Sequence, residues 1–237
     1  MSRYAMFVDL ERCVGCSACT VACQASYGLA PENRFTKVNL TTAGEYPSLK
    51  GTFVTTQCMH CEAPPCAEVC PTGATYKTAE GPVVVREEDC IGCRYCVTAC
   101  PYDARTYDEE RKIVRKCSFC YADLQKGREP ACVRTCIGGA RLFGDLDDPE
   151  SAIARAIREA DVIRVAGTSF YYRLPEGMER DLLPADFEAP RYLYPWQSVI
   201  QPLGQIVLAG AASAAALSLA VHGLRALRER RKQHEGA

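Results

Sequence analysis

The chain has 237 residues and is nearly neutral, with 28 Lys and Arg against 29 Asp and Glu. This length allows one large domain or two small ones with an appendage, and the balanced charge gives no sign of the basic stripe of a nucleic-acid-binding protein. The unusual feature is the 16 cysteines, which suit disulfides, zinc sites or iron–sulfur clusters.

Residues 1–9 contain no apolar h-region, cleavage site or twin-arginine pair, so we expect no export signal of the chain's own. Residues Tyr4–Asp9 are the first of several short runs that predict strands. The others are Gly51–Thr56, Pro82–Arg86 and Ile113–Lys116. These runs lie between or beside sets of closely spaced cysteines.

Four cysteine tetrads lie between residues 13 and 136 and use all 16 cysteines. The first and third are spaced CxxCxxCxxxC, and the second is spaced CxxCxxxxCxxxC. The fourth has eleven residues between its CxxC and its CxxxC. In order, the tetrads are Cys13, Cys16, Cys19 and Cys23; Cys58, Cys61, Cys66 and Cys70; Cys90, Cys93, Cys96 and Cys100; and Cys117, Cys120, Cys132 and Cys136.

This spacing favours [4Fe–4S] clusters over the two other kinds of site. Disulfides are typical of small secreted domains with scattered cysteines, and structural zinc sites take two ligands from each of two knuckles. The third tetrad, closed by Pro101, matches the bacterial ferredoxin run C-x2-C-x2-C-x3-C-P, and Pro71 closes the second. Four tetrads therefore predict four [4Fe–4S] clusters.

The segments around the tetrads predict an α+β fold. Short helices are expected to begin at the third cysteine of a tetrad, as in Cys66–Val69 and Cys96–Ala99. The proline after the fourth cysteine would then end the helix. A strand, a cysteine loop and a helical turn, repeated along the chain, are typical of ferredoxin-like modules.

The segment after the tetrads is predicted to be a surface helix followed by an extended arm. Residues Asp147–Asp161 place Ile153, Ala156, Ile157 and Ala160 on one helical face. The Pro-containing segment 174–195 then suggests an arm that contacts a partner, and a solvated linker is an equal alternative.

Near the C-terminus, residues 198–224 are predicted to form one transmembrane helix. The stretch from Tyr192 to Leu224 has no charged side chain, and a spanning helix needs about 20 apolar residues. Tyr192, Tyr194 and Trp196 precede it as an aromatic belt would, and a basic tail, residues 225–237, follows. Its small-xxx-small pairs suit packing on another membrane subunit, although a helix buried in a soluble partner is an alternative.

The basic tail also predicts the orientation of the chain. By the positive-inside rule the C-terminus lies in the cytoplasm, so the cysteine-rich body lies on the extracytoplasmic, periplasmic side. A body on the cytoplasmic side is the alternative. A body outside the cytoplasm would have to cross the membrane folded, together with a partner that carries an export signal.

The chain shows little sign of a substrate site of its own. It has no CxxCH haem motif and no Gly-rich nucleotide loop. Of the three histidines, His60 lies inside a CxxC loop, where we interpret it as a polar residue that shapes the surroundings of a cluster. In two-cluster ferredoxins the fourth ligand of each cluster comes from the other tetrad, so the clusters lie close enough for electron hopping. We therefore expect a non-catalytic electron carrier.

With the tetrads placed, residues 4–146 resemble the four-cluster iron–sulfur subunits of the molybdopterin oxidoreductases. These include the β subunit of membrane formate dehydrogenase and the B subunits of dimethyl sulfoxide, polysulfide, thiosulfate and tetrathionate reductases. The segment from Gly138 to Pro149 is also similar to this family. Gln24 and Ile137 stand where the prolines of the other tetrads do, which weakens a helix stop but not the ligation.

The resemblance implies that tetrads one and four form one ferredoxin-like unit, residues 1–50 and 111–146, and that tetrads two and three form a second, inserted unit, residues 51–110. In nitrate-reductase relatives the position that matches Cys93 is not a cysteine, and a three-iron cluster results. Here the position is a cysteine, so the resemblance implies four cubane clusters. The implied ligand groups are Cys13, Cys16, Cys19 and Cys136; Cys117, Cys120, Cys132 and Cys23; Cys58, Cys61, Cys66 and Cys100; and Cys90, Cys93, Cys96 and Cys70. Residues 147–197 would be the helix and arm outside these units.

The resemblance also implies partners: a large molybdenum or tungsten molybdopterin catalytic subunit, and an integral membrane subunit that carries quinone or haem. The lipid bilayer is a third partner, and no nucleic acid is expected. Two alternatives stay open, a cluster subunit of a membrane-bound [NiFe] hydrogenase and a free polyferredoxin.

Overall fold

The structure is a computed structural model that describes residues 2–187 together with Gly210, Ser213 and Ser218. It divides into two units, Met1–Ala189 and Pro190–Ala237. The predicted transmembrane helix and basic tail therefore lie outside the described residues, except for those three positions. Among the residues described, no helix has the length and apolar character to cross a membrane.

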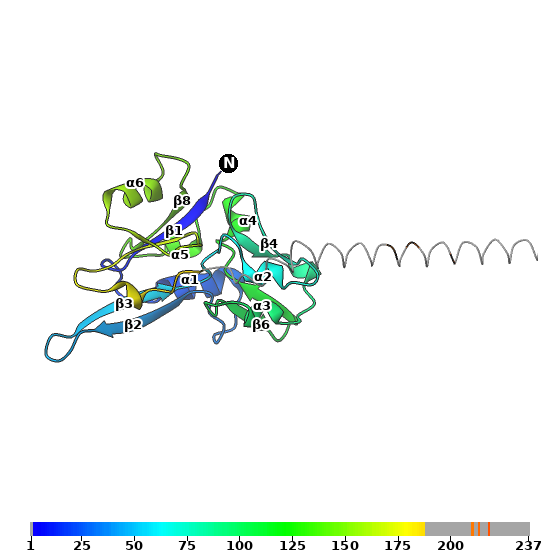
Figure 1. The fold of residues 1–237 in the computed structure, drawn as a ribbon, viewed down its shortest axis with the longest axis horizontal. Coiled ribbons are helices and arrows are strands. Elements are labelled where there is room, and N and C mark those ends of the chain that lie inside the picture. The colour runs from blue at the N-terminus through cyan, green and yellow to red at the C-terminus, as the bar shows by residue number, and fades with distance from the viewer. Residues whose placement is uncertain (1, 188–209, 211–212, 214–217, 219–237) are drawn as a thin grey trace, which may run out of the picture. The chain divides into compact units, whose positions relative to one another are not determined.

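The first unit is an α+β body of short elements, as the sequence predicts (Figure 1). Its strands are β1 (Tyr4–Asp9), β2 (Lys37–Ala43), β3 (Lys50–Thr56), β4 (Thr75–Lys77), β5 (Val83–Val85), β6 (Arg105–Asp108), β7 (Ile113–Lys116), β8 (Arg141–Asp145), β9 (Ile163–Arg164) and β10 (Phe170–Arg173). Its α-helices are α1 (Ala18–Tyr27), α2 (Pro65–Glu68), α3 (Tyr95–Thr98), α4 (Tyr121–Leu124), α5 (Ala131–Arg134) and α6 (Ala152–Glu159).

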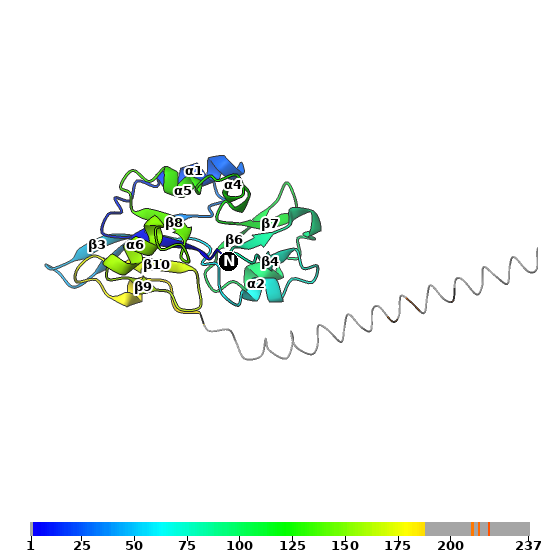
Figure 2. The same ribbon diagram turned by 90° about the horizontal axis from the view of Figure 1, so that it is seen from above.

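The strands form one four-stranded sheet and three hairpins. The sheet has the order β8-β1-β10-β9, with β1 antiparallel to β8 and parallel to β10. The hairpins pair β2 with β3, β4 with β5, and β6 with β7. In both ribbon views the sheet and α6 lie at one side of the body, and the hairpins β4–β5 and β6–β7 lie at the other (Figure 2).

Strand β1 is buried on both faces because two different layers cover it. Side chains alternate across a strand, so Met6 and Val8 face the cysteine-rich core while Ala5 and Phe7 pack against Ile153 of α6. These four residues in the middle of β1 are at most 4 % exposed. The central strand thus separates the cysteine loops from a helix that follows the last tetrad.

The predicted local elements agree with the structure within a residue or two. The strands at Tyr4–Asp9 and Ile113–Lys116 have the predicted bounds, and β3 begins one residue earlier than predicted. Helices α2 and α3 each begin one residue before the third cysteine of their tetrads. Such agreement is expected because turn residues and proline act over only a few positions.

The segment after residue 146 differs from its prediction. Helix α6 is shorter than predicted and begins after Ser151, whose hydroxyl accepts a hydrogen bond from the Ala154 amide at 3.2 Å. The strands β9 and β10, which the sequence analysis does not include, then complete the four-stranded sheet. The described part of the predicted arm also packs on the body, where Leu183 is only 6 % exposed. Residues 188–195 of the arm lie outside the described part of the chain.

Candidate iron–sulfur centres

The structure brings cysteines of different tetrads together. We number the four predicted ligand sets as follows: group 1 is Cys13, Cys16, Cys19 and Cys136; group 2 is Cys117, Cys120, Cys132 and Cys23; group 3 is Cys58, Cys61, Cys66 and Cys100; group 4 is Cys90, Cys93, Cys96 and Cys70. The members of group 1 line one cavity and those of group 3 line another, and in group 2 Cys23 lies close to Cys117, Cys120 and Cys132. In group 4 Cys96 lies close to Cys70 and Cys93, and Cys90 packs against the buried cluster that contains Cys96. That each group binds one cluster stays a prediction.

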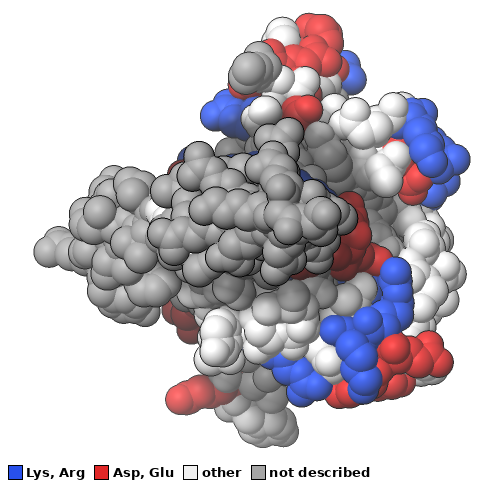
Figure 3. All heavy atoms as spheres, turned by 90° about the vertical axis from the view of Figure 1, so that its right-hand side faces the viewer, with Lys and Arg blue, Asp and Glu red and all other residues white. Residues whose placement is uncertain are grey.

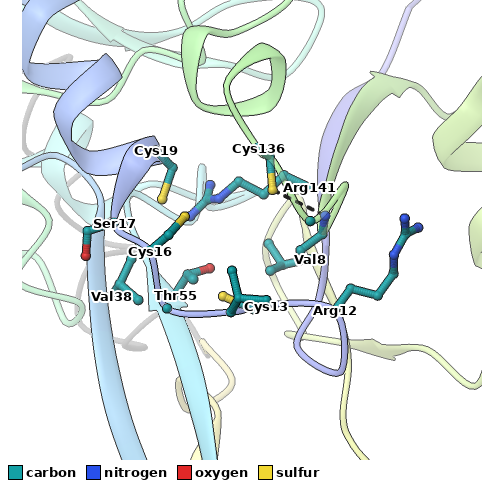
Figure 4. Close-up of a pocket in the computed structure, with 14 residues that line it drawn as sticks. Val8, Arg12, Cys13, Cys16, Ser17, Cys19, Val38, Thr55, Cys136 and Arg141 are labelled. Atoms are coloured by element: carbon teal, nitrogen blue, oxygen red, sulfur yellow. Dashed lines mark hydrogen bonds between the residues drawn. The ribbon is translucent and has the colours of Figure 1, made fainter.

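Groups 1 and 3 each surround a small cavity. Cys13, Cys16, Cys19 and Cys136 line the first cavity, and Arg141 reaches into the space between them (Figure 4). The Ala140 amide donates a hydrogen bond to the Cys136 sulfur at 3.2 Å. The four cysteines of group 3 line the second cavity together with Arg105. Each cavity is therefore lined by four cysteines and a buried arginine, and Arg12 also lines the first.

In groups 2 and 3, burial and the proximity of other thiols disfavour ionisation of the cysteine thiols. Burial raises the pKa of Cys23 to about 12, and the neighbouring Cys132 and Cys120 of group 2 contribute to the rise. Burial also raises the pKa of Cys61 to about 12, with Cys58 and Cys66 adding to the effect. Thiols held this way ionise when cations bind between them, because the thiolate is the metal ligand.

The helices show how distant tetrads come together. Helix α1, which follows the first cysteines of tetrad one, packs against α5 of tetrad four, and the two lie side by side in Figure 2. Helix α2 of tetrad two packs in the same way against α3 of tetrad three. The fourth cysteine of tetrad one, Cys23, lies within α1, and the fourth cysteines of the other tetrads lie two residues beyond the ends of α2, α3 and α5. The packing of each helix pair therefore brings the fourth cysteine of one tetrad towards the loop of the other.

The CxxC loops share one backbone feature. The residue before the second cysteine has a positive φ in all four loops: 68° at Gly15, 48° at His60, 68° at Gly92 and 56° at Phe119. A left-handed residue turns the loop sharply and costs glycine little, whereas other residues lose about 1–2 kcal/mol. His60 and Phe119 therefore need compensating contacts.

Those contacts come from stacking of the two residues on each other. The His60 and Phe119 rings have centroids 3.5 Å apart and are 0 % and 1 % exposed. The Val83 amide donates to His60 Nδ1 at 2.9 Å. Burial, aided by nearby Lys116 and other cations, lowers the pKa of His60 well below its usual value, so the ring is neutral. His60 lies in the CxxC loop as predicted, but it is fully buried, and its stacked ring joins the loops of groups 2 and 3.

Exposure of the cysteines differs between the groups in a regular way. Groups 1 and 4 each contain one exposed cysteine, Cys16 and Cys93. In group 2 all four are buried, and in group 3 only Cys100 is partly exposed. Cys117 of group 2 lies close to Cys58 of group 3, and Cys132 of group 2 lies close to Cys19 of group 1. Arg105 lies close to cysteines of both group 3 and group 4. The groups therefore adjoin one another in the order 1, 2, 3, 4, and the exposed cysteines belong to the first and the last.

Two buried arginines are functional candidates that the sequence analysis missed. Arg105 and Arg141 begin β6 and β8 and are 4 % and 3 % exposed. Burial opposes the charge of each guanidinium, yet nearby cysteines of two groups raise its pKa overall. A signal was present in the sequence, because each arginine follows an alanine and lies five residues after a fourth cysteine, Cys100 or Cys136.

The donor set fits iron–sulfur clusters. Four thiols line each of the cavities of groups 1 and 3, and buried N–H groups of Arg105 and Arg141 form no hydrogen bond of normal geometry with the described protein atoms. Cluster sulfurs would supply acceptors for them. Among residues 2–187, no three Cys, His, Asp or Glu side chains are placed to hold a single metal ion.

The surface charge is mixed. On the face shown in Figure 3, basic and acidic side chains lie next to each other. Ion pairs of this kind include Arg94 with Glu109 at 3.2 Å and Arg111 with Glu87 at 2.6 Å. Exposed pairs like these add little stability.

Comparison with known proteins agrees with this geometry. Two families described as 4Fe–4S dicluster domains match residues 49–146 and 12–74. The chain is 43 % identical over 192 residues to the B subunit of tetrathionate reductase from Salmonella typhimurium, covering 76 % of each protein. It is 40 % identical to the B subunit of selenate reductase from Mesobacillus selenatarsenatis, over 69 % of this chain and 67 % of the relative.

A third relative is the B subunit of anaerobic dimethyl sulfoxide reductase from Haemophilus influenzae, 39 % identical over 62 % of this chain and 77 % of the relative. The two family matches together extend over residues 12–146, which contain the four tetrads. The protein belongs to the family of 4Fe–4S dicluster B subunits of the molybdopterin oxidoreductases, which are non-catalytic electron-transfer subunits, and its 16 cysteines provide for four [4Fe–4S] clusters.

Proposed function

We propose that this chain relays electrons between a molybdopterin catalytic subunit and a membrane subunit that carries quinone or haem, with groups 1 to 4 as the ligands of its four clusters. The observation that carries the proposal is the order of the groups. Exposed Cys16 and Cys93 lie in the two end groups, and the middle groups are buried. Such a series can accept an electron at one end and release it at the other.

The cluster supplies one-electron chemistry when bound, and the protein supplies the ligands and their surroundings. Hydrogen bonds to sulfur are one of the means by which a protein sets the potential of a cluster. The Phe119 amide donates to the Cys117 sulfur at 3.4 Å, and Gln57 donates to the same sulfur at 3.7 Å. At the far end, the Val114 amide donates to the Cys90 sulfur at 3.5 Å.

Apolar side chains beside both end groups support a protein partner at each end. Val14 and Ile137 adjoin cysteines of group 1 and are 60 % and 76 % exposed. Ile91 and Tyr95 lie next to cysteines of group 4 and are 65 % and 64 % exposed. Exposed apolar residues gathered near a functional group are typical of protein contact sites.

The relatives' names support the class of the catalytic partner. They are subunits of tetrathionate, selenate and dimethyl sulfoxide reductases. The catalytic partner proposed here is of the same class of molybdoenzyme, and its substrate is selected in that other chain.

Purification of the complex from membranes under anaerobic conditions tests the relay. We expect about 16 irons in this chain, the number that four cubane clusters need, and a large co-purifying subunit that contains molybdenum or tungsten. Nickel in that subunit would instead assign the chain to a [NiFe] hydrogenase. A chain that purifies alone would favour a free polyferredoxin, and zinc in place of iron would overturn the cluster assignment.

We further propose that residues 198–224 anchor the chain in the membrane, with the body on the periplasmic side. The support is the uncharged stretch, the aromatic residues before it and the basic tail after it. Deletion of residues 196–237 is expected to move a brown, four-cluster body from the membrane to the soluble fraction. The measurement is the distribution of protein and iron after ultracentrifugation, with the full chain as the control.

The side of the membrane has a separate test. A protease added to intact spheroplasts should degrade the body of the full chain if that body is periplasmic. Protection of the body in spheroplasts, together with digestion in broken cells, would place it in the cytoplasm.

The anchor itself has a separate contradicting outcome. A chain without residues 196–237 that stays in the membrane fraction would contradict the proposal that residues 198–224 anchor the chain.

A further inference from the structure

One arginine lies between the two cysteine groups at each end of the series. The ionisable side chains close to Arg141 are Tyr172 and three cysteines, Cys132 of group 2 and Cys19 and Cys136 of group 1. Figure 4 shows its side chain extending among the cysteines of group 1. The neighbours of Arg105 are Cys66 and Cys58 of group 3 and Cys96 of group 4. The two arginines thus hold equivalent places in the two halves of the body.

Each guanidinium is held at one nitrogen by the protein. Arg141 Nη1 donates to Gln57 Oε1 at 2.8 Å, and Arg105 Nη1 donates to Thr75 Oγ1 at 3.2 Å. None of the ion pairs within the described part of the chain includes Arg105 or Arg141. The positive charge therefore faces the cysteines without a compensating acidic side chain.

The remaining nitrogens point to a missing acceptor. Arg141 Nη2, Arg105 Nε and Arg105 Nη2 are buried and form no hydrogen bond of normal geometry within the described residues, although Arg105 lies beside the Cys66 and Cys96 sulfurs and Arg141 beside the Cys132 sulfur. An unsatisfied buried donor costs about 1–3 kcal/mol, and more when it is charged. Buried Lys116 differs in this respect, because its ammonium donates to the carbonyls of Val83 and Cys117.

We propose that Arg105 and Arg141 donate hydrogen bonds to the sulfurs of the two clusters on either side and raise the reduction potentials of both. The proposal rests on the ligand groups given under the proposed function. Reduction adds one negative charge to a cluster, and a fixed cation in a medium of low dielectric constant stabilises that state. A charge-assisted hydrogen bond to sulfur strengthens as the sulfur gains electron density.

The test is a redox titration of the complete purified complex, followed by electron paramagnetic resonance, for wild type, Arg105→Gln and Arg141→Gln. In Arg141→Gln, the equilibrium constant for reduction should fall at least tenfold for the clusters of groups 1 and 2, which is about 59 mV for a one-electron couple. Arg105→Gln should affect groups 3 and 4 in the same way. Each variant serves as the matched control for the other, because the remote pair should change much less.

Lysine variants separate charge from packing. Arg105→Lys and Arg141→Lys keep the charge with fewer donors, so their potentials should lie between those of wild type and the glutamine variants. Unchanged potentials in glutamine variants that retain full iron would overturn the proposal and leave the relay intact. Equal shifts of all four clusters would also overturn it. Fewer than about 16 irons in the wild-type chain would instead contradict the four-cluster relay of the proposed function.

A measurement on the wild-type complex covers variants that fail to assemble. With arginine labelled by 15N, pulsed electron paramagnetic resonance of the reduced clusters should detect a 15N hyperfine coupling transmitted through the hydrogen bond to sulfur. The unlabelled complex is the control. Absence of a 15N coupling from every reduced cluster would overturn the proposal without any substitution.

Discussion

Replacing Cys23 by alanine is expected to remove the cluster bound by tetrad four, not the cluster bound by the first three cysteines of its own tetrad. Cys23 is buried, and the thiols of Cys132 and Cys120, both in tetrad four, lie close to it. The iron content should fall by about four from a total of about 16, the number that four cubane clusters need. The measurement is iron per chain, together with the paramagnetic signals of the reduced protein.

Two further substitutions make this result decisive. Cys120→Ala should remove the same paramagnetic signal as Cys23→Ala, because both residues belong to group 2. Cys19→Ala should remove a different signal, that of group 1. If Cys23→Ala and Cys19→Ala abolish the same signal, each tetrad binds its own cluster and the exchanged ligand groups are wrong.

Replacing Gly92 by alanine is expected to prevent stable binding of the cluster in group 4. Gly92 has a φ of 68°, and an added Cβ would lie 2.2 Å from the backbone oxygen of Lys112. That oxygen belongs to the turn between β6 and β7, so relief of the clash requires movement of the backbone. We expect a loss of about four irons and faster bleaching of the remaining visible absorbance on warming.

Gly73→Ala is the matched control for this substitution. Gly73 has nearly the same φ, 67°, but no atom lies within 4 Å of its added Cβ. This variant should lose only the intrinsic preference of glycine for the left-handed region, about 1 kcal/mol, and keep all its iron. Equal losses in Gly73→Ala and Gly92→Ala would show that backbone strain, not the contact with the Lys112 oxygen, causes the effect.

Elements set by nearby residues could be predicted well. The strands β1 and β7 follow from short runs of β-branched and aromatic residues bounded by breakers, and helices α2 and α3 begin beside their cysteines. Strand β9 could not be predicted, because its two residues carry no periodicity. Strand β10 pairs with β1, more than 150 positions away, in the register Met6 to Phe170. Propensity over a short window carries no information about such a partner.

The site shows the same division at the level of single residues. The sequence predicts cysteine ligands because three thiolates on one short loop are a local pattern. It does not reveal that His60 is a core residue, because the Phe119 ring on which it stacks lies in another tetrad. Nor does it show that Arg105 and Arg141 are buried among sulfurs, since most arginines are solvated and composition cannot distinguish the two.

By itself, the sequence determined the chemistry of this protein: the number of tetrads, the ligand type and the α+β elements around each loop. Apart from the family resemblance, nothing in the residues showed which tetrads meet, and the packing of α1 on α5 and of α2 on α3 brings them together. The tertiary structure also decided that the outer groups are accessible and the middle groups are buried. The physical reason is that ligand spacing is a property of a few consecutive residues, whereas burial and charge environment depend on packing between segments far apart in the sequence.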